Sequence, residues 1–380
     1  MKLKILKNEL NESIQHVSKA VSSRTTIPIL SGIKIDANAS GITLTASDTD
    51  ISIQSFIPTE KDGSHIIQLE TQGSVVLPAK FFVEIIKKLP DDEVEIEVKD
   101  QFQTWIRSGK SEIHMIGLDP EEYPLLPQLE QNETFTVQSD LLKSMIRQTL
   151  FCVSTNESTP ILTGVQWQMA EGKLKLIATD RHRLATRQAQ IPDVEQLQFK
   201  NIVISGKNLN ELNKILPDQN EPVQIVVAES QVLFKIDTNL FYTRILDGLY
   251  PDTSKIIPQS FKTEMVISTK SLLNAVDRAY LLSREEKTNI VRLVAEESGL
   301  VEISSSQTEL GKIKEEIETE SYSGEAFKIS FNSKYMLDAL KAMDCEKIHI
   351  GFTGAMSPIV LKPSDHVELV YVILPYRTTG

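Results

Sequence analysis

The chain has 380 residues, 41% of them hydrophobic and 24% charged, and a formal net charge of −12 at pH 7. These values are ordinary for globular protein with buried cores, and the length predicts two or three domains. They argue against a helical membrane protein, because no stretch approaches the roughly 18 apolar residues that a span needs, and against an ordinary nucleic-acid binder, which usually carries a basic surplus.

Six segments have the apolar spacing of amphipathic helices. In the first, Leu10, Ile14 and Val17 recur at intervals that place them on one helix face. The second reads KFFVEIIKK, and Pro90 follows and ends it. In chain order, the predicted helices cover residues 7–21, 79–90, 138–152, 206–217, 269–282 and 333–343.

Short runs of alternating apolar and polar residues lie between these helices. Residues 41–56, 93–100 and 111–118 are of this kind and predict antiparallel strands. Each third of the chain then holds two helices and about eight strands, and each half of a third has the order β-α-β-β-β. The predicted fold class is α+β.

An internal repeat is the main signal in the sequence. Residues 27–33 read IPILSGI and residues 159–165 read TPILTGV; ASDTD at 46–50 is answered by ATDRH at 178–182. The helical segments that open at Lys80, Lys207 and Lys334 recur with similar spacing. Three copies of about 127 residues therefore account for the chain. The predicted modules are 1–127, 128–253 and 254–380, the last with a C-terminal strand.

An open array of three such modules would leave sheet edges unpaired at both ends, which invites aggregation. Homo-oligomers usually close by symmetry. Pairing the first and third modules of two chains head to tail removes both edges. The prediction is a homodimeric ring of six modules, with twelve helices around a central hole.

The distribution of charge fits such a ring. The six predicted helices hold an excess of Lys and Arg over Asp and Glu, so the rest of the chain is more acidic than the net charge of −12. Cationic helices around a hole attract the phosphates of a nucleic acid whatever its sequence, and an acidic exterior repels DNA outside the hole. The alternative is that each lysine simply lies on a solvated helix face.

Catalytic motifs do not account for the sequence. RSGKSE at 107–112 resembles the end of a phosphate-binding loop, but Thr104 stands where that loop requires glycine. Asp180 and His182 are close in sequence, yet no second cluster accompanies them as metal ligands or as an acid–base partner. The chain is expected to be no enzyme and to use no metal or cofactor. The distant Cys152 and Cys345 indicate no disulfide framework and favour a reducing cytoplasm.

The C-terminal segment VILPYRTTG (372–380) is apolar before it turns polar, which is unusual for a frayed terminus. One interpretation is a last strand packed on the third module. The other is one wall of an apolar groove that docks short peptides.

Several segments, spread from end to end with consistent spacing, match a known family. Together they resemble the β subunit of bacterial DNA polymerase III. The segments are SSRTTIPILSGIKI (22–35), KFFVEIIKKLP (80–90), RSGKSE (107–112), PEEYP (120–124), ATDRHRLA (178–185), DGLYPDT (247–253), ISFNSKYMLDAL (329–340), FTGAMSP (352–358) and VILPYR (372–377).

The resemblance implies a DNA sliding clamp, a processivity factor that encircles duplex DNA without reading its sequence. It implies a homodimer in the cytoplasm at the nucleoid, with no membrane partner. It also implies that the replicative polymerase α subunit, the clamp loader and repair polymerases dock through short linear motifs in one groove between the second and third modules. The groove residues implied are Leu162, Thr179, His182, Arg183, Leu184, Pro251, Ile256, Val372, Leu374, Pro375, Tyr376 and Arg377.

The resemblance assigns two further sets of residues. For DNA binding, they are Arg24, Lys80, Asn156, Pro160 and Ile161. For the dimer interface, Leu281 and Leu282 are expected to meet Ile113 of a second chain.

Two positions depart from the family pattern. Thr159 stands where relatives commonly carry arginine, which predicts one fewer phosphate contact. Arg181 stands where a small residue is usual, and a long cation there either narrows the groove or favours an acidic partner segment. Two other functions stay open at this point: a peptide-binding scaffold without DNA, and a hydrolase that uses Asp180 and His182.

Overall fold

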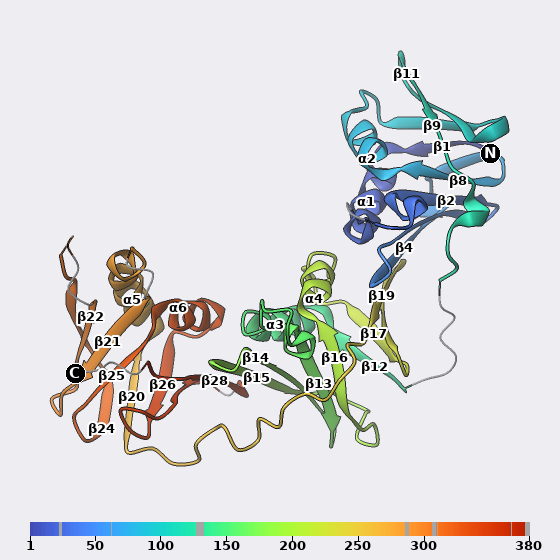
Figure 1. Ribbon diagram of the computed structural model, residues 1–380. Coiled ribbons are helices and arrows are strands. Elements are labelled where there is room, and N and C mark those ends of the chain that lie inside the picture. Colours follow the sequence, from blue (N-terminus) through green and yellow to red (C-terminus); the bar gives the residue numbers. More distant parts are fainter. Residues whose placement is uncertain are drawn as a thin grey trace. The chain divides into compact units, whose positions relative to one another are not determined.

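The structure is a computed structural model that describes residues 1–22, 25–61, 63–126, 133–285, 289–305, 309, 311–365 and 367–376 (Figure 1). The predicted helices are present, with small differences at their ends. The α-helices are α1 (Lys7–Val17), α2 (Ala79–Lys88), α3 (Ser139–Leu150), α4 (Gly206–Asn213), α5 (Thr269–Ser283) and α6 (Ser333–Ala342).

Two helices, the first and the fourth, end four residues before their predicted ranges do. The first tightens after Val17 into a 3-10 turn, Ser18–Ala20, instead of continuing to residue 21. The fourth ends at Asn213 rather than at residue 217. The reason is Pro217, which has no N–H and disfavours helical geometry in the residue before it. Ile215 and Leu216 are buried in the turn that replaces the last helical residues.

Each helix lies in the same local order, with one strand before it and three after it, as predicted. In residues 1–127 these strands are β1 (Lys2–Leu6), β2 (Gly32–Asn38), β3 (Gly41–Ser47) and β4 (Ile51–Pro58), then β8 (Gly73–Pro78), β9 (Glu93–Val98), β10 (Gln103–Ser108) and β11 (Ser111–Ile116). Additional short strands are β5 (Glu60–Lys61), β6 (Ser64–His65) and β7 (Ile67–Thr71).

The second and third repeats follow the same order. The second has β12 (Glu133–Gln138), β13 (Gly164–Ala170), β14 (Lys173–Thr179), β15 (Arg183–Gln190), β16 (Phe199–Ser205), β17 (Pro222–Val227), β18 (Gln231–Ile236) and β19 (Asn239–Arg244). The third has β20 (Thr263–Ser268), β21 (Ile290–Ala295), β22 (Leu300–Ser305), β23 (Lys314–Glu318), β25 (Phe327–Asn332), β26 (Lys347–Phe352), β27 (Ile359–Pro363) and β28 (Leu369–Ile373), with β24 (Ser321–Gly324) added.

The strands form compact units that do not coincide with the sequence repeats. One unit is Met1–Asp140 with Lys214–Ile245, and the other is Leu141–Asn213 with Leu246–Gly380. The first holds a five-stranded sheet, β11-β10-β9-β1-β7, and an eight-stranded sheet, β12-β17-β18-β19-β4-β3-β2-β8. The second holds a nine-stranded sheet, β16-β13-β14-β15-β28-β27-β26-β20-β24, and a four-stranded sheet, β23-β22-β21-β25. Repeat two therefore contributes strands to both units.

Sheets continue across both repeat boundaries with one pattern. β4 of the first repeat pairs with β19 of the second, and β15 of the second pairs with β28 of the third, both antiparallel. In each case the last strand of one β-α-β-β-β unit meets the last strand of another. β11 and β23 are likewise the last strands of their β-α-β-β-β units, and in the described part of the chain each is the edge of its sheet.

Candidate functional site

An apolar cluster lies where β15 meets β28, and it unites three of the predicted groove residues. Leu162 comes from a 3-10 turn (Pro160–Thr163), Leu184 from β15 and Val372 from β28, and all three are buried. The other buried members are Ile177, Val203, Tyr250 and Val360, and Ile161, Leu246, Ile257, Phe261 and Val370 pack against them half-buried. The cluster also includes the strand residues Ile177, Val203 and Val360, which were not predicted for the site because period-two alternation indicates a buried face but not what packs against it.

Exposed apolar side chains come from segments next to this cluster. The exposed fractions are 39% for Ile256, 39% for Leu374 and 51% for Tyr376, and Pro251 is also exposed. Large exposed apolar side chains beside a buried cluster indicate a candidate protein-binding surface.

The C-terminal segment is held by backbone hydrogen bonds on both sides. The N–H of Leu374 donates to the carbonyl of His182, and the N–H of Tyr376 donates to that of Ser330, at 2.9 and 2.7 Å. Pro375 forms an isolated antiparallel β-bridge with Phe331. The segment is therefore a last strand packed into the fold, and its exposed side chains leave the groove interpretation open. Arg377 lies outside the described residues.

Thr179 and Tyr250 fix the polar side of the cluster. The N–H of Thr179 donates to the Tyr250 hydroxyl at 3.0 Å, and the Thr179 hydroxyl donates to the carbonyl of Arg183 at 2.7 Å. Burial raises the pKa of the Tyr250 phenol, so its hydroxyl stays protonated in the neutral range. Thr179 is itself buried, and its hydroxyl stabilises the turn that follows it by hydrogen bonds to the backbone of Arg183 and Arg181.

Arg183 is engaged inside the protein. Its guanidinium pairs with Asp180 at 2.9 Å and with Asp338 at 2.7 Å, and lies 5.5 Å and 4.5 Å from the ring centroids of Phe151 and Tyr335. Burial pushes the pKa of Arg183 down, but Cys152 and the carboxylates of Asp338 and Asp180 together more than offset this, so the pKa is raised and the side chain stays charged. Arg183 thus joins the second repeat to the third beside the predicted groove.

The turn at 180–183 has a counterpart in the first repeat. Asp180 Oδ1 accepts from the N–H groups of His182 and Arg183, and Asp48 Oδ1 accepts from those of Asp50 and Ile51. Arg181 and Thr49 follow these aspartates at φ values of 75° and 81°, the left-handed region that disfavours side chains with a Cβ. Both repeats therefore build the same strained turn with different residues.

This turn does not form an acid–base pair. The carboxylate of Asp180 is taken by backbone N–H groups and by Arg183, and no hydrogen bond joins it to the His182 ring within the described chain. The ring of exposed His182 instead lies nearly parallel to that of Tyr335, with 6.3 Å between centroids. The geometry gives the hydrolase interpretation no support.

The residues predicted to contact DNA lie at the starts of helices and turns. Lys80 is exposed in the first turn of α2, with its Nζ 5.6 Å from the Phe81 ring centroid. Asn156 is exposed, and its Oδ1 accepts from the N–H of Ser158. Pro160 is exposed, whereas Ile161 packs against the apolar cluster and thus belongs partly to it. Arg24 lies outside the described residues.

Other helical cations differ in whether they are neutralised. Arg147 pairs with Asp344, and Arg278 forms two hydrogen bonds with Glu315. Several exposed lysines make no ion pair with any residue that the structure describes. They are Lys80, Lys87, Lys270, Lys334 and Lys341.

The predicted dimer residues lie at exposed ends of the fold. Ile113 is in the middle of the edge strand β11 and is half-buried. Leu281, near the end of α5, is 48% exposed, and the following Leu282 is half-buried. Burial of these side chains requires another surface.

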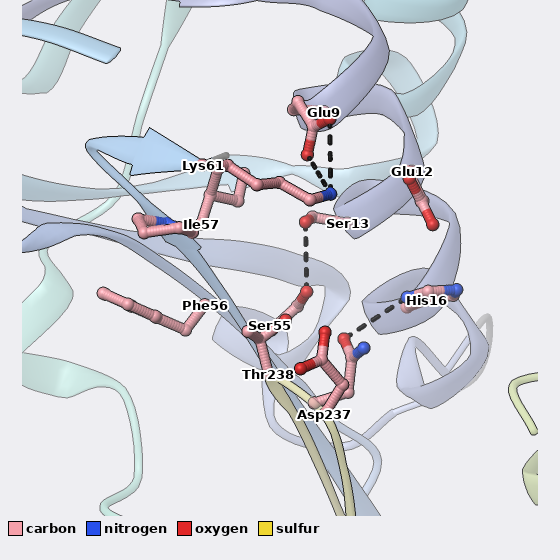
Figure 2. Close-up of a pocket in the computed structure, with 12 residues that line it drawn as sticks. Glu9, Glu12, Ser13, His16, Ser55, Phe56, Ile57, Lys61, Asp237 and Thr238 are labelled. Carbon is pink, nitrogen blue, oxygen red and sulfur yellow. Dashed lines mark hydrogen bonds and ion pairs between the residues drawn. The ribbon is translucent and has the colours of Figure 1, made fainter. Parts of the chain in front are cut away.

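A cavity of about 210 Å³ lies between α1 and the turn that joins β18 to β19 (Figure 2). Glu9 and His16 project from α1; Glu9 accepts from Lys61 at 3.2 Å, and His16 Nδ1 lies 3.3 Å from Asn239 Oδ1. Ser55 donates to Ser13 at 3.0 Å. The contact between His16 and Asn239 joins the first repeat to the second, and the other two lie within the first repeat. No group of three His, Cys, Asp or Glu among the described residues is arranged to bind a metal ion.

Family models of the DNA polymerase III beta subunit match along the chain: the N-terminal domain over residues 1–127, the central domain over 136–252 and the C-terminal domain over 254–377. The chain is 52% identical to the beta sliding clamp of Bacillus subtilis over 378 residues, covering 100% of both, and 46% identical to that of Staphylococcus epidermidis over 371 residues, covering 98% and 97%.

Solved structures agree with these matches. The crystal structure of the DNA polymerase sliding clamp from Bacillus subtilis superposes with a TM-score of 0.97 over 100% of both chains at 52% identity. That of the DNA polymerase III beta chain from Streptococcus pneumoniae superposes with a TM-score of 0.95 at 36% identity, over 99% and 100%. No helix in the described ranges is long and apolar enough to cross a membrane. The chain therefore belongs to the DNA polymerase III beta subunit family, the bacterial beta sliding clamps.

Proposed function

We propose that this non-catalytic clamp subunit closes with a second copy into a head-to-tail ring of six modules, each chain contributing modules 1–127, 128–253 and 254–380. The ring encircles duplex DNA and tethers the replication machinery to it. The observation that carries the proposal is the repeated junction: β4 pairs with β19 and β15 with β28, whereas the equivalent strands β11 and β23 have one edge unpaired in the described chain.

The register of the known junctions extends to the proposed seam. Ile53 pairs with Phe241, and Ala185 pairs with Tyr371. Counted along the strand ladders, Ile113 holds in β11 the position that Phe241 holds in β19 and Tyr371 holds in β28. Ile313, directly before β23, holds the position that Ala185 holds in β15, and its carbonyl accepts from the N–H of Ser305. Ile313 of one chain would then pair with Ile113 of the next.

The same register brings opposite charges together. One residue further along each strand, Lys314 would lie opposite Glu112, and beyond it Glu316 would lie opposite Lys110. Opposite charges in directly facing positions stabilise a strand pair. A one-residue slip would lose both pairs and turn each strand's apolar side chains to the other face of the sheet.

Helix packing supports the same seam. Phe151 follows α3 and lies edge-on to Tyr371, with 5.1 Å between ring centroids. Leu281 holds the corresponding place in α5, counted from the first residue of each helix. Leu281 would therefore lie over Ile113 of the second chain, as the family resemblance predicts, with Leu282 beside it.

The proposed DNA contacts are weak and independent of sequence. The exposed helical lysines that pair with no carboxylate among the described residues attract phosphate through a screened field, with Arg24, Lys80 and the 156–161 loop as the proposed contacts. The net charge of −12 is compatible with this, because a ring is retained by topology rather than by affinity. Weak contacts also permit sliding.

The apolar cluster at the β15–β28 junction is the proposed docking surface for partner proteins. Buried Leu162, Leu184 and Val372 supply an apolar floor, and exposed Leu374 and Tyr376 supply one side. A short linear motif with a Leu/Phe pair suits such a surface, since a few anchor side chains carry most of the binding energy. The proposed partners are the polymerase α subunit, the clamp loader and repair polymerases, in the cytoplasm at the nucleoid.

Retention on circular DNA tests this function. The protein is loaded onto nicked plasmid by a clamp loader, washed in high salt, and followed as a restriction enzyme linearises the DNA. We expect it to stay on circles and to leave once ends appear. If salt removes it equally from circular and linear DNA, the linkage is electrostatic, and the scaffold alternative replaces the ring.

A further inference from the structure

Arg181 occupies an unfavourable backbone conformation and reaches across to another segment. Its φ of 75° lies in the left-handed region, where glycine is usual. The Asp180 carboxylate holds the turn by accepting from the next two N–H groups. From there the Arg181 guanidinium donates to the hydroxyl of Thr159 at 3.0 Å. The two positions that depart from the family pattern are therefore in contact.

The positive charge of Arg181 is available to a ligand. The side chain is exposed, and no carboxylate pairs with it within the described ranges of the chain. Arg183, two residues later, is the opposite case, because Asp180 and Asp338 neutralise it. The hydrogen bond to Thr159 occupies one N–H group and leaves the rest of the planar fork to bind an acceptor.

The fold does not require this contact. The first repeat builds the same turn with Thr49, at φ 81°, and its counterpart of Thr159 is Ile27, which offers no side-chain acceptor. Arg181 and Thr159 are thus a pair that the second repeat adds to a shared turn.

Both residues border the proposed docking surface. Thr159 directly precedes the 3-10 turn that carries Leu162, and Arg181 is in the turn that leads into Leu184. Ile161, between Thr159 and Leu162, packs against the apolar cluster. The Arg181 guanidinium therefore lies at the edge of the surface where these two elements meet.

We propose that Arg181, positioned by Thr159, binds a carboxylate of the docked peptide and makes this clamp prefer motifs with an acidic residue next to their apolar anchors. The inference rests on the proposed docking surface. A guanidinium recognises a carboxylate through paired N–H groups, which an amide or hydroxyl cannot match. The neighbouring apolar cluster favours a peptide over DNA phosphate as the occupant.

Fluorescence anisotropy on the full-length protein tests the preference. The parent probe is a fluorescein-labelled pentapeptide with a Gln and a Leu/Phe pair. In a series of variant peptides, a single aspartate is placed at one of the remaining positions or added at one end. In the unmodified protein we expect at least one aspartate to strengthen binding about three- to fivefold, the scale of an exposed ion pair. Arg181→Gly and Arg181→Gln remove this gain, Arg181→Lys keeps part of it, and Thr159→Val reduces it.

The chain provides a matched control for backbone effects. Arg181→Gly relieves the strained turn, so the variant is expected to fold and to bind the parent peptide as before. Thr49→Gly relieves the equivalent turn of the first repeat and should leave the aspartate preference unchanged. A general effect of strain relief would appear in both variants.

Other outcomes overturn the inference in distinguishable ways. An aspartate gain that persists in Arg181→Gly, or equal weakening of every peptide, removes Arg181 as the carboxylate ligand. Loss of retention on circular DNA with unchanged peptide binding makes Arg181 a phosphate contact. If the parent peptide does not bind, or still binds to Leu184→Asp, the docking surface itself is wrong and the inference fails with it.

Discussion

At the scale of single residues, two buried tyrosines differ in whether their hydroxyl has a hydrogen-bond partner. Tyr250 and Tyr371 are exposed by only 4% and 1%. The hydroxyl of Tyr250 accepts from the N–H of Thr179, whereas that of Tyr371 has no hydrogen-bond partner in the described part of the protein. A buried hydroxyl without a partner costs roughly 1–3 kcal/mol, and one with a partner contributes about 1 kcal/mol.

The two Tyr→Phe substitutions are therefore expected to differ in sign. Tyr371→Phe keeps the ring against Phe151 and should leave the free energy of unfolding unchanged or raise it by up to about 1 kcal/mol. Tyr250→Phe should lower the free energy of unfolding by about 1 kcal/mol. Urea unfolding followed by circular dichroism measures both; equal losses would show that the Tyr371 hydroxyl is satisfied in solution.

At this scale, residues of the candidate site could be predicted from the sequence, but not all of their interaction partners. Leu162, Leu184 and Val372 were predicted as neighbours through the family resemblance, and the apolar cluster unites them. Arg183 was predicted on the groove, yet its guanidinium pairs with Asp338, which is 155 positions away. Nothing in local spacing identifies such a partner, because ion pairs form where the topology brings side chains together.

At the scale of elements, each helix is followed by a change of sheet. β1 lies in the five-stranded sheet, while β2, β3 and β4, which follow α1, lie in the eight-stranded one. The sequence predicted the β-α-β-β-β order because periodicity is local. The exchange between sheets was not predicted, since alternation shows that a strand has a buried face and leaves its pairing partner open.

The proposed register of the seam can be tested by exchanging charges on β11 and β23. Glu112→Lys places like charges opposite each other and should weaken dimerisation, roughly two- to fivefold, as expected for an exposed cross-strand pair. Lys314→Glu alone should weaken it similarly, and the double variant should restore it.

Analytical ultracentrifugation across a dilution series measures these constants. A double variant as weak as the sum of the single ones would place Glu112 and Lys314 out of register. Glu60→Lys, on the short strand β5, serves as a charge-matched control away from the seam and should leave the dimer unchanged.

At the scale of the whole molecule, buried phenols predict how stability responds to alkali. Burial raises the pKa of Tyr123, Tyr250 and Tyr371. The native state therefore holds these protons to higher pH than the unfolded chain. Their contribution is complete below the ordinary tyrosine pKa of about 10 and falls as pH rises above it.

Urea midpoints at pH 8 and pH 11 test this dependence. We expect a lower midpoint at pH 11, and a smaller drop in Tyr371→Phe, which has one fewer phenol to ionise. Each such group contributes up to about 1.4 kcal/mol per pH unit above 10. An identical drop in the variant would show that Tyr371 ionises as readily when folded as when unfolded.

The three-fold repeat was visible in the sequence, and so was the α+β class, because both depend on patterns along the chain. The boundary between the compact units was not visible. It falls inside the second repeat, whose strands β12, β17, β18 and β19 join the first unit while β13 to β16 join the second. Similarity between copies marks where a unit was duplicated, and hydrogen bonding between strands decides where the structure divides.

This interleaving governs the order in which the protein can form as it leaves the ribosome. The first compact unit ends at residue 245, and its eight-stranded sheet lacks β17 to β19 until they have been synthesised. The second begins at residue 141 and needs β28, which ends at Ile373. Each nascent sheet therefore waits through more than a hundred residues of translation, seconds at ordinary elongation rates, with a strand edge that other chains can reach.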